Sequence, residues 1–332
     1  MKRFTVIVVA VATFCVSARA APLPPDVTKI VSFIFLADPD GNIAKDASNK
    51  PIPWGTGFFV GIKLGDGSHM SGYLVTAKHV LKDEQGRDLK RVYVRMNSKE
   101  GDPKFAPLDL YENNVSRVHT HTDPTVDLAV VPVSPDEKTI DFKMIGEELL
   151  LTKDSFSELK ISEGSDVFFV GLFTSFYGQH KNFPIARFGR VAMISAEKIP
   201  WQDRPTEPVQ EADLYLLETQ SYGGNSGSPV FFYLGSDRVP GQLYLGVEIR
   251  LAGVMRGTFL NGSPIQFRQS PTAMIPFSTQ NIGIAAVTPS YLLHEILYSE
   301  SLMKSRAEIT GSLGSPTKSP EPAPITPTEP AK

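Results

Sequence analysis

Three side chains of the types used in nucleophilic hydrolysis lie in separate segments of the sequence, each beside an apolar run. Ser226 lies in GGNSGSPVFF, His79 in GYLVTAKHVL and Asp127 in PTVDLAVVPV. A serine hydroxyl is a weak nucleophile at neutral pH, so it needs a base that takes its proton and a third group that holds the base. A histidine and an aspartate would fill those two roles. Asp123 lies close to Asp127 and is the alternative carboxylate, although the VDLAVV context favours Asp127.

The elements that would position these residues are predicted to be β-strands. Short runs rich in β-branched and aromatic residues recur along the chain, including GTGFFVGIKL, DLAVVPV, DVFFVGLF and SPVFFYL. Glycine, proline, asparagine, aspartate or serine bounds each run, which is typical of antiparallel strands joined by turns. Residues 134–165 are charged and lack strand alternation, so they are predicted to connect two β units. Two six-stranded barrels fit this pattern, and a single elaborated sandwich is the alternative.

One long stretch, from Pro289 to Arg306, has helical periodicity. Its apolar positions fall near i, i+4 spacing and a proline stands at its start. These positions are Leu292, Leu293, Ile296, Leu297 and Met303. We therefore expect an all-β protein with a C-terminal helix over residues 289–306.

The motifs YLVTAKHV, DLAVV and GGNSGSPVF, in this order, resemble the three active-site segments of the chymotrypsin-like (trypsin-fold) serine peptidases. The form GNSGSP is similar to bacterial secreted members, namely glutamyl endopeptidases and the protease domain of high-temperature-requirement proteases. The resemblance covers about Ile30 to Leu297. It implies a domain at 21–310 made of two six-stranded antiparallel β-barrels, at about 28–135 and 165–290, with the C-terminal helix.

By this resemblance the protein is expected to be a serine-type endopeptidase that acts on protein or peptide substrates. Ser226 would be the nucleophile, His79 the general base and then acid, and Asp127 the carboxylate that orients the histidine. The backbone N–H groups of Gly224 and Ser226 would form the oxyanion hole. No cofactor and no metal ion are implied.

The resemblance places the substrate pocket at Thr219, Gln220 and Ser221. No aspartate lies just before the serine motif, so a preference for Lys or Arg at P1, the substrate residue before the cleaved bond, is disfavoured. The histidine that glutamyl endopeptidases use is missing from residues 243–256, where Arg250 or Arg256 would be the cationic substitute. The expectation is a small or uncharged P1 residue.

Two functions compete with an endopeptidase. The first is a catalytically silent double-barrel protein that binds a protein or cell-wall partner, and the second is an esterase or acyltransferase that uses the same triad. A separate motif, SELK from Ser157 to Lys160, matches the S-x-x-K of penicillin-binding enzymes, but the companion motifs S-D-N and K-T-G are absent.

The two ends of the sequence predict an exported protein. Residues 1–20, MKRFTVIVVAVATFCVSARA, have a basic start, an apolar run and a final Ala-Arg-Ala, the pattern of a cleaved secretory signal. Cys15, the only cysteine, lies inside this signal, so the mature chain would form no disulfide. This favours a secreted or periplasmic bacterial protein. Residues 311–332 are rich in proline, serine and threonine and are predicted to be a disordered tail.

The overall charge favours no polyanionic partner. The net charge is -3, which gives no electrostatic reason to bind nucleic acid or an anionic membrane. Beyond the predicted signal, no apolar run is long enough to cross a bilayer. The sequence contains no indication of the oligomeric state.

Overall fold

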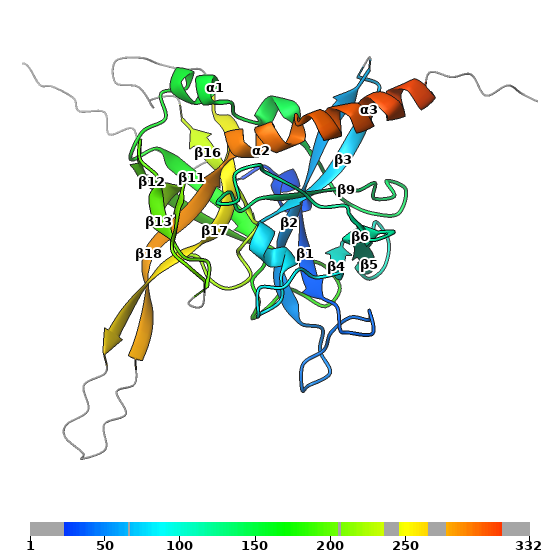
Figure 1. Ribbon diagram of the computed structural model, residues 1–332, viewed down its shortest axis with the longest axis horizontal. Helices are drawn as coiled ribbons and strands as arrows, with labels where there is room; N and C mark the ends of the chain where they lie inside the picture. Colours follow the sequence, from blue (N-terminus) through cyan, green and yellow to red (C-terminus); the bar gives the residue numbers. More distant parts are fainter. Residues whose placement is uncertain (1–22, 66, 205–206, 236–245, 265–276, 314–332) are drawn as a thin grey trace, which may run out of the picture.

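The computed structural model describes residues 23–65, 67–204, 207–235, 246–264 and 277–313 (Figure 1). The predicted signal, 1–20, therefore lies outside the described residues. Of the predicted tail, 311–332, only residues 311–313 are described.

The chain forms mostly β-strands, as predicted, with short helical turns between them and two helices at the end. The strands are β1 (Val31–Leu36), β2 (Pro53–Leu64), β3 (His69–Thr76), β4 (Arg91–Met96), β5 (Lys104–Asp109), β6 (Tyr111–Glu112), β7 (Val115–Ser116), β8 (His119–Thr120), β9 (Ala129–Pro132), β10 (Ile145–Gly146), β11 (Asp166–Gly171), β12 (Ile185–Ile194), β13 (Ile199–Trp201), β14 (Gln210–Ala212), β15 (Tyr215–Glu218), β16 (Pro229–Leu234), β17 (Glu248–Pro264) and β18 (Phe277–Pro289). The helices are α1 (Lys153–Glu158), α2 (Ser290–Leu297) and α3 (Glu300–Leu313), with 3-10 turns η1 (Pro25–Lys29), η2 (Lys78–Leu81) and η3 (Glu147–Leu149).

The N-terminal β unit is an open, curved sheet, so the prediction of a closed six-stranded barrel at 28–135 was wrong. Its strand order is β5-β4-β1-β2-β3-β9-β8, with β10 paired to β2. Within the described residues β5 does not pair with β8 or β9. Pro107 in β5 and Pro132 at the end of β9 carry no N–H for a ladder between these edges. The guanidinium of Arg117 bridges them instead, donating to the carbonyls of Asp109 (3.1 Å) and Pro132 (3.2 Å).

The open sheet encloses a hollow between its two edges. A cavity of about 260 Å³ lies there, lined mainly by apolar side chains that include Phe59, Leu74 and Met96. The aliphatic and aromatic residues of this half therefore pack around a core that is accessible from one side.

The C-terminal β unit is a closed six-stranded barrel, as predicted. Its order is β11-β12-β15-β18-β17-β16, with antiparallel neighbours throughout. Phe168 and Phe231 stack across β11 and β16 with ring centroids 5.0 Å apart. Strands β17 and β18 continue past the barrel as a long hairpin (Figure 1).

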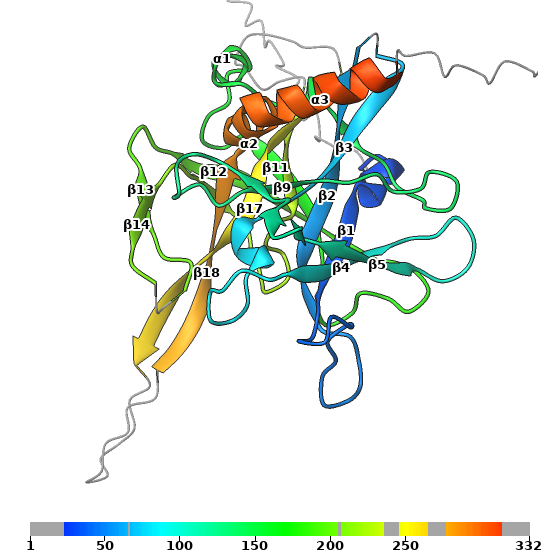
Figure 2. The same ribbon diagram turned by 45° about the vertical axis from the view of Figure 1, so that its right-hand side comes forward.

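One apolar cluster joins the two β units and the C-terminal helices. It contains Phe58 and Val60 of the first unit, Phe168 and Phe231 of the second, and Leu293 of α2. In Figures 1 and 2 the two β units lie side by side, and α2 and α3 run along one edge of both. The two units are thus held against each other by shared core packing.

The predicted C-terminal helix is interrupted. Two helices, α2 and α3, replace the single helix expected over 289–306, and α3 continues to Leu313, into the predicted tail. The break after Leu297 shifts the buried face, so Leu302 is buried (1% exposed), whereas Met303, expected on the apolar stripe, is 46% exposed. No helix within the described ranges has the length and apolar character needed to span a bilayer.

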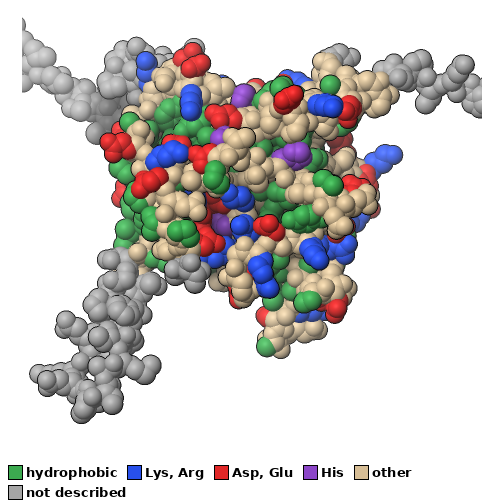
Figure 3. Space-filling view, in the orientation of Figure 1, with side chains coloured by type: hydrophobic (Ala, Val, Ile, Leu, Met, Phe, Trp, Pro, Cys, Tyr) green, Lys and Arg blue, Asp and Glu red, His purple; other side chains and the backbone are tan. Residues whose placement is uncertain are grey.

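Charge is well mixed on the surface that Figure 3 shows. Acidic and basic side chains alternate over the described part of this face, without a broad region of one sign. This face therefore offers no electrostatic platform for a polyanion.

Candidate active site

His79 stands on a short 3-10 turn at the end of β3. The turn η2 is anchored by Ala77, Val80 and Leu81, all buried, and the N–H of Val80 donates to the carbonyl of Ala77 (3.0 Å). These apolar contacts fix the backbone and leave the His79 side chain 24% exposed. An imidazole held in this way can face both a buried partner and a ligand.

Asp127 is that buried partner. Val126 and Leu128 on either side of it are buried, and Asp127 itself is 1% exposed. One carboxylate oxygen accepts the backbone N–H of His79 (2.9 Å), and the other lies 2.7 Å from His79 Nδ1. This paired geometry fixes the orientation of the imidazole and leaves Nε2 as the free ring nitrogen for a substrate or nucleophile.

Asp123, the alternative carboxylate, has other partners. Its oxygens bind Lys198 Nζ (2.8 Å) and the hydroxyl of Thr125 (2.7 Å). These contacts hold the pKa of Asp123 well below its usual range. The structure thus places Asp127, and not Asp123, beside His79.

Ser226 lies in a loop that the side chain of Asn225 braces from within. The side-chain oxygen Oδ1 of Asn225 accepts a hydrogen bond from the backbone N–H of Tyr222 (2.9 Å). The side-chain nitrogen Nδ2 donates to the backbone carbonyl of Leu172 (2.8 Å). From the other β unit, the N–H of Thr56 donates to the carbonyl of Ser226 (2.9 Å). The loop is therefore held from both halves of the molecule.

Gly224 meets a steric requirement in this loop. Its φ is +90°, a conformation that residues with a side chain rarely adopt, and a Cβ here would lie 2.6 Å from Thr174 Cγ2. Thr56 Oγ1 donates to the Gly224 carbonyl (2.8 Å) and fixes that peptide. Among the hydrogen bonds of the described residues, none uses the N–H of Gly224 or of Ser226. Both donors are therefore available to a ligand oxygen.

The hydroxyl of Ser226 points to an acceptor other than His79. Ser226 Oγ donates to the carbonyl of Arg256 (3.2 Å), and no hydrogen bond joins it to His79 in the described part of the chain. The structure thus couples His79 directly to Asp127, and directs the hydroxyl of Ser226 to the backbone carbonyl of Arg256 on strand β17.

The electrostatics of the histidine–aspartate pair favour its charged form. Burial lowers the pKa of His79, but the charge of Asp127 and the hydrogen bond to it outweigh burial and place the pKa above its ordinary value of 6.5. For Asp127 burial acts in the opposite direction and raises the pKa, but His79 and the nearby Arg256 hold this pKa well below its usual range. Asp127 is therefore ionised when His79 takes up a proton.

Arg256, Asp203 and Trp201 belong to the site, although the sequence did not single them out as a group. Arg256 is 3% exposed and binds Asp203. The expectation that Arg256 would supply a positive charge to the substrate pocket therefore does not fit its position. Arg250, the other candidate cation, pairs with Glu248 (2.7 Å). One signal was present: an arginine in the apolar run LAGVMRGTFL needs a buried counter-ion.

The predicted pocket residues divide by exposure. Thr219 and Ser221 are buried, whereas Gln220 is exposed and accepts a hydrogen bond from the hydroxyl of Tyr222 (2.7 Å). Asn281 of β18, which the sequence did not indicate, donates to the carbonyl of Ser221 (2.6 Å).

Asn281 also contacts strand β17 beside the site. Its side-chain oxygen accepts the hydroxyl of Thr258 (3.1 Å) and the N–H of Gly283 (2.8 Å). The amide therefore joins β17, β18 and the segment before the serine loop with fixed polar contacts.

Only one cluster in the described residues has the spacing of metal ligands. His79, Asp127 and Asp203 offer atoms within 4.8 Å of one another. A guanidinium already compensates these carboxylates, because Arg256 binds Asp203 and lies 3.8 Å from Asp127. The guanidinium therefore offsets one of the two carboxylate charges that would attract a cation.

Comparison with protein-family models gives one match. A family model described as a trypsin-like peptidase domain matches residues 55–236, a range that includes His79, Asp127 and Ser226. No curated protein gave a significant match.

Several solved structures are similar to the chain. The MamO protease domain from Magnetospirillum magneticum is 16% identical, with a TM-score of 0.44, over 83% of this chain and 99% of that one. The active form of the Rv3671c protease from M. tuberculosis is 17% identical, with a TM-score of 0.40, over 82% of this chain and 80% of that one. The HtrA-type protease AlgW is 16% identical, with a TM-score of 0.41, over 82% of this chain and 60% of that one.

Proposed function

Because the chain belongs to the trypsin-like peptidase family, we propose that it is a serine endopeptidase whose triad is Ser226, His79 and Asp127. The observation that carries the proposal is the contact between the buried carboxylate of Asp127 and His79 Nδ1 at 2.7 Å. A histidine whose Nδ1 is held in this way presents Nε2 as a base. The glycine-rich loop supplies the nucleophile close by.

The proposed reaction begins when Ser226 turns from the Arg256 carbonyl to His79. As Ser226 Oγ attacks the substrate carbonyl carbon, His79 Nε2 takes the hydroxyl proton and the C=O electron pair moves onto oxygen. The imidazolium is stabilised by Asp127, and the oxyanion accepts the N–H groups of Gly224 and Ser226. Collapse of the tetrahedral intermediate expels the amine, which takes the proton from His79.

Hydrolysis of the acyl-enzyme completes the proposed cycle. A water gives its proton to His79 Nε2 and attacks the ester carbon of Ser226. The same two backbone donors stabilise the second oxyanion, and Ser226 leaves with the proton held by His79. The chain's own residues therefore account for every proton in the two half-reactions.

The proposed substrate pocket favours a small or uncharged P1 side chain. Thr219, Gln220 and Ser221 are its proposed base and wall, and we add Asn281 because it binds the carbonyl of Ser221 (2.6 Å). This hydrogen bond fixes the position of the Asn281 amide beside the segment that contains the three proposed pocket residues. None of these four positions carries a charged side chain.

We propose that the peptidase domain, residues 21–310, acts outside the cytoplasm of a bacterium, in the periplasm or after secretion. The proposal is supported by the basic, apolar and Ala-Arg-Ala pattern of residues 1–20. Fractionation of cells that express the full chain, with N-terminal sequencing of the exported form, tests it. A cytoplasmic protein that retains residues 1–20 would contradict export.

The proposed activity is tested with purified protein that lacks residues 1–20. We expect a fluorophosphonate probe to label it and casein to be cleaved, and Ser226→Ala to abolish both. Ser157→Ala is the matched control, because Ser157 is an exposed serine on α1. Loss of labelling in the control would assign the nucleophile to the S-x-x-K motif instead.

The same experiment separates the competing functions. A folded protein that neither labels nor cleaves casein would replace the enzyme with a binding protein of the same fold. Labelling with turnover of ester but not amide substrates would indicate an esterase or acyltransferase. Comparison of the two substrate types under identical conditions decides between these outcomes.

A further inference from the structure

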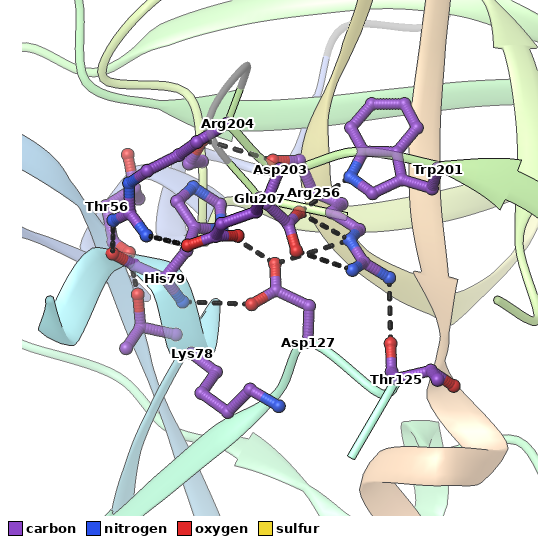
Figure 4. Close-up of polar contacts among 12 residues, drawn as sticks. Thr56, Lys78, His79, Thr125, Asp127, Trp201, Asp203, Arg204, Glu207 and Arg256 are labelled. Atoms are coloured by element: carbon purple, nitrogen blue, oxygen red, sulfur yellow. Dashed lines mark hydrogen bonds and ion pairs between the residues drawn. The ribbon is translucent and has the colours of Figure 1, made fainter. Parts of the chain in front are cut away.

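A second buried ion pair touches the proposed triad. Arg256 of β17 donates from Nε and Nη2 to the two carboxylate oxygens of Asp203, at 2.9 and 2.7 Å. Its Nη1 donates to the carbonyl of Thr125 (2.9 Å), and its Nε lies 3.8 Å from a carboxylate oxygen of Asp127. Figure 4 shows the guanidinium of Arg256 facing the carboxylates of both Asp203 and Asp127. The arginine is therefore shared by two carboxylates.

Asp203 has an aromatic hydrogen-bond partner in addition to Arg256. It follows strand β13, and the indole N–H of Trp201 donates to its Oδ1 (2.6 Å). The guanidinium of Arg256 lies 5.7 Å from the centre of the Trp201 ring. Asp203 offers a carboxylate oxygen within 4.8 Å of ligand atoms of both His79 and Asp127. Two carboxylates thus stand near one imidazole.

The net charge of this cluster suits a proton on His79. With neutral His79, the two carboxylates and one guanidinium sum to one negative charge. When His79 becomes an imidazolium, the sum is zero. Because charges interact strongly where water is excluded, the second carboxylate favours the protonated state that forms during acyl transfer.

Among the described residues, the other charged side chains near His79 bind partners other than its imidazole ring. Lys78, on the same turn, donates to the carbonyl of Pro124 (2.7 Å). Arg204 reaches the backbone carbonyl of His79 (3.5 Å), and its guanidinium is paired with Glu207 (2.7 Å). The carboxylates that face the imidazole ring are therefore those of Asp127 and Asp203, with Arg256 as their common counter-ion.

We propose that Asp203 and Arg256 are positioning residues that extend the triad. Asp203 supplies a second negative charge that stabilises the His79 imidazolium, and Arg256 holds the two carboxylates side by side. The role in catalysis rests on the proposed peptidase function. The charge coupling to His79 is a property of the folded protein and is measurable without a substrate.

The test measures the pKa of His79 by NMR in the folded protein, from the pH dependence of its imidazole C–H signal. The sequence has six histidines, so the signal is assigned by its loss in His79→Gln. Asp203→Asn keeps the side-chain shape and removes one negative charge, so the pKa of His79 should fall by about one pH unit or more. Arg256→Gln removes the positive charge, so the same pKa should rise.

A third variant separates charge from packing. Arg256→Lys keeps the positive charge but loses the bidentate contact, so the pKa of His79 should stay closer to that of the wild type than in Arg256→Gln. An ion pair that only anchors the hairpin β13–β14 would lower the unfolding midpoint in these variants without opposite movements of this pKa. If Arg256→Gln does not fold, Asp203→Asn and Arg256→Lys still give the comparison.

The activity readout follows the same logic. In Asp203→Asn the acidic limb of the pH profile of kcat/KM should move to lower pH, with a plateau reduced about tenfold or more. An unchanged His79 pKa in folded Asp203→Asn, or a shift in the same direction in Asp203→Asn and Arg256→Gln, would overturn the proposal. If the wild-type protein has no peptidase activity, the proposed function fails, but the NMR comparison of the His79 pKa can still be made. The two failures are therefore distinguishable.

Discussion

Replacement of Gly224 by alanine is expected to damage the serine loop in a way that replacement of its neighbour Gly223 does not. Gly224 has a φ of +90°, and a Cβ at that position would lie 2.6 Å from Thr174 Cγ2 and 3.2 Å from Leu172 Cδ2. At Gly223 a Cβ would have no heavy atom within 4 Å, and φ is not positive. The two glycines therefore form a matched pair for one substitution.

The expected cost follows from two contributions. A non-glycine residue held at this φ costs about 1–3 kcal/mol. The contacts with Thr174 and Leu172 add about 1 kcal/mol, because Thr174 is exposed and can move whereas Leu172 is buried. The total for Gly224→Ala is about 2–4 kcal/mol. Gly223→Ala should be neutral, or slightly stabilising because alanine restricts the unfolded chain.

The cost can appear in either of two measurements, and both are needed. If the loop keeps its shape, the free energy of unfolding from denaturant titration falls by the full amount. If the loop shifts to relieve the strain, the N–H of Gly224 moves away from the oxyanion and kcat/KM falls by about 10²–10³-fold. Thr174→Ser in the Gly224→Ala background removes the nearest methyl group, so it should recover the packing contribution only.

The reasoning is refuted if Gly224→Ala matches Gly223→Ala in both stability and kcat/KM. Equal losses in the two variants would also contradict it, because the structure distinguishes the two sites by φ and by neighbouring atoms. A full recovery by Thr174→Ser would show that steric overlap, and not backbone conformation, is the cause.

Three further predictions concern the charge and shape of the site. Asp127→Asn should lower kcat/KM by about 10⁴-fold. Asp123→Asn should change kcat/KM by less than about threefold, since an exposed ion pair contributes little. Similar losses of kcat/KM in the two variants would contradict the role assigned to Asp127. Asn281→Ala should increase cleavage after larger P1 residues in a peptide library, and an unchanged P1 profile would exclude Asn281 from the pocket. Because the folded pKa of His79 is raised above 6.5, its ion pair with Asp127 stabilises the protein fully below that value and loses this contribution as pH rises through the folded pKa. Denaturant titrations between about pH 6 and pH 9 should therefore show a larger loss of stability in the wild type than in His79→Gln, and parallel curves would argue against the raised pKa.

Local patterns in the sequence were sufficient to predict much of the fold. Runs of β-branched and aromatic residues between turn residues predicted a mainly β chain, and six strands of the second unit close as expected. The apolar spacing at Leu292, Leu293, Ile296 and Leu297 predicted α2, whose buried face contains all four. Such patterns are local because a strand or helix must turn its apolar residues to one face.

The candidate site could be predicted in part for the same reason. His79, Asp127 and Ser226 each stand next to an apolar segment, so their types and settings were visible in the sequence. In the structure Asp127 contacts His79, whereas Ser226 bonds the Arg256 carbonyl, and the catalytic roles of the three residues stay a prediction. Which hydroxyl rotamer is adopted depends on acceptors from other strands, and no local pattern contains them.

Local patterns of residues were thus enough to predict the strand-rich character of the chain, the three motifs and the need for glycine before the serine. The open edge of the first sheet at Arg117 and the link from Asp203 through Arg256 to Asp127 depend instead on contacts between distant segments. Asp203 and Arg256 are far apart in the chain and meet because the separate two-stranded sheet β13–β14 packs against strand β17 of the barrel, where Trp201 contacts Phe259. Burial then makes their pairing obligatory, since a lone charge there would be too costly to desolvate.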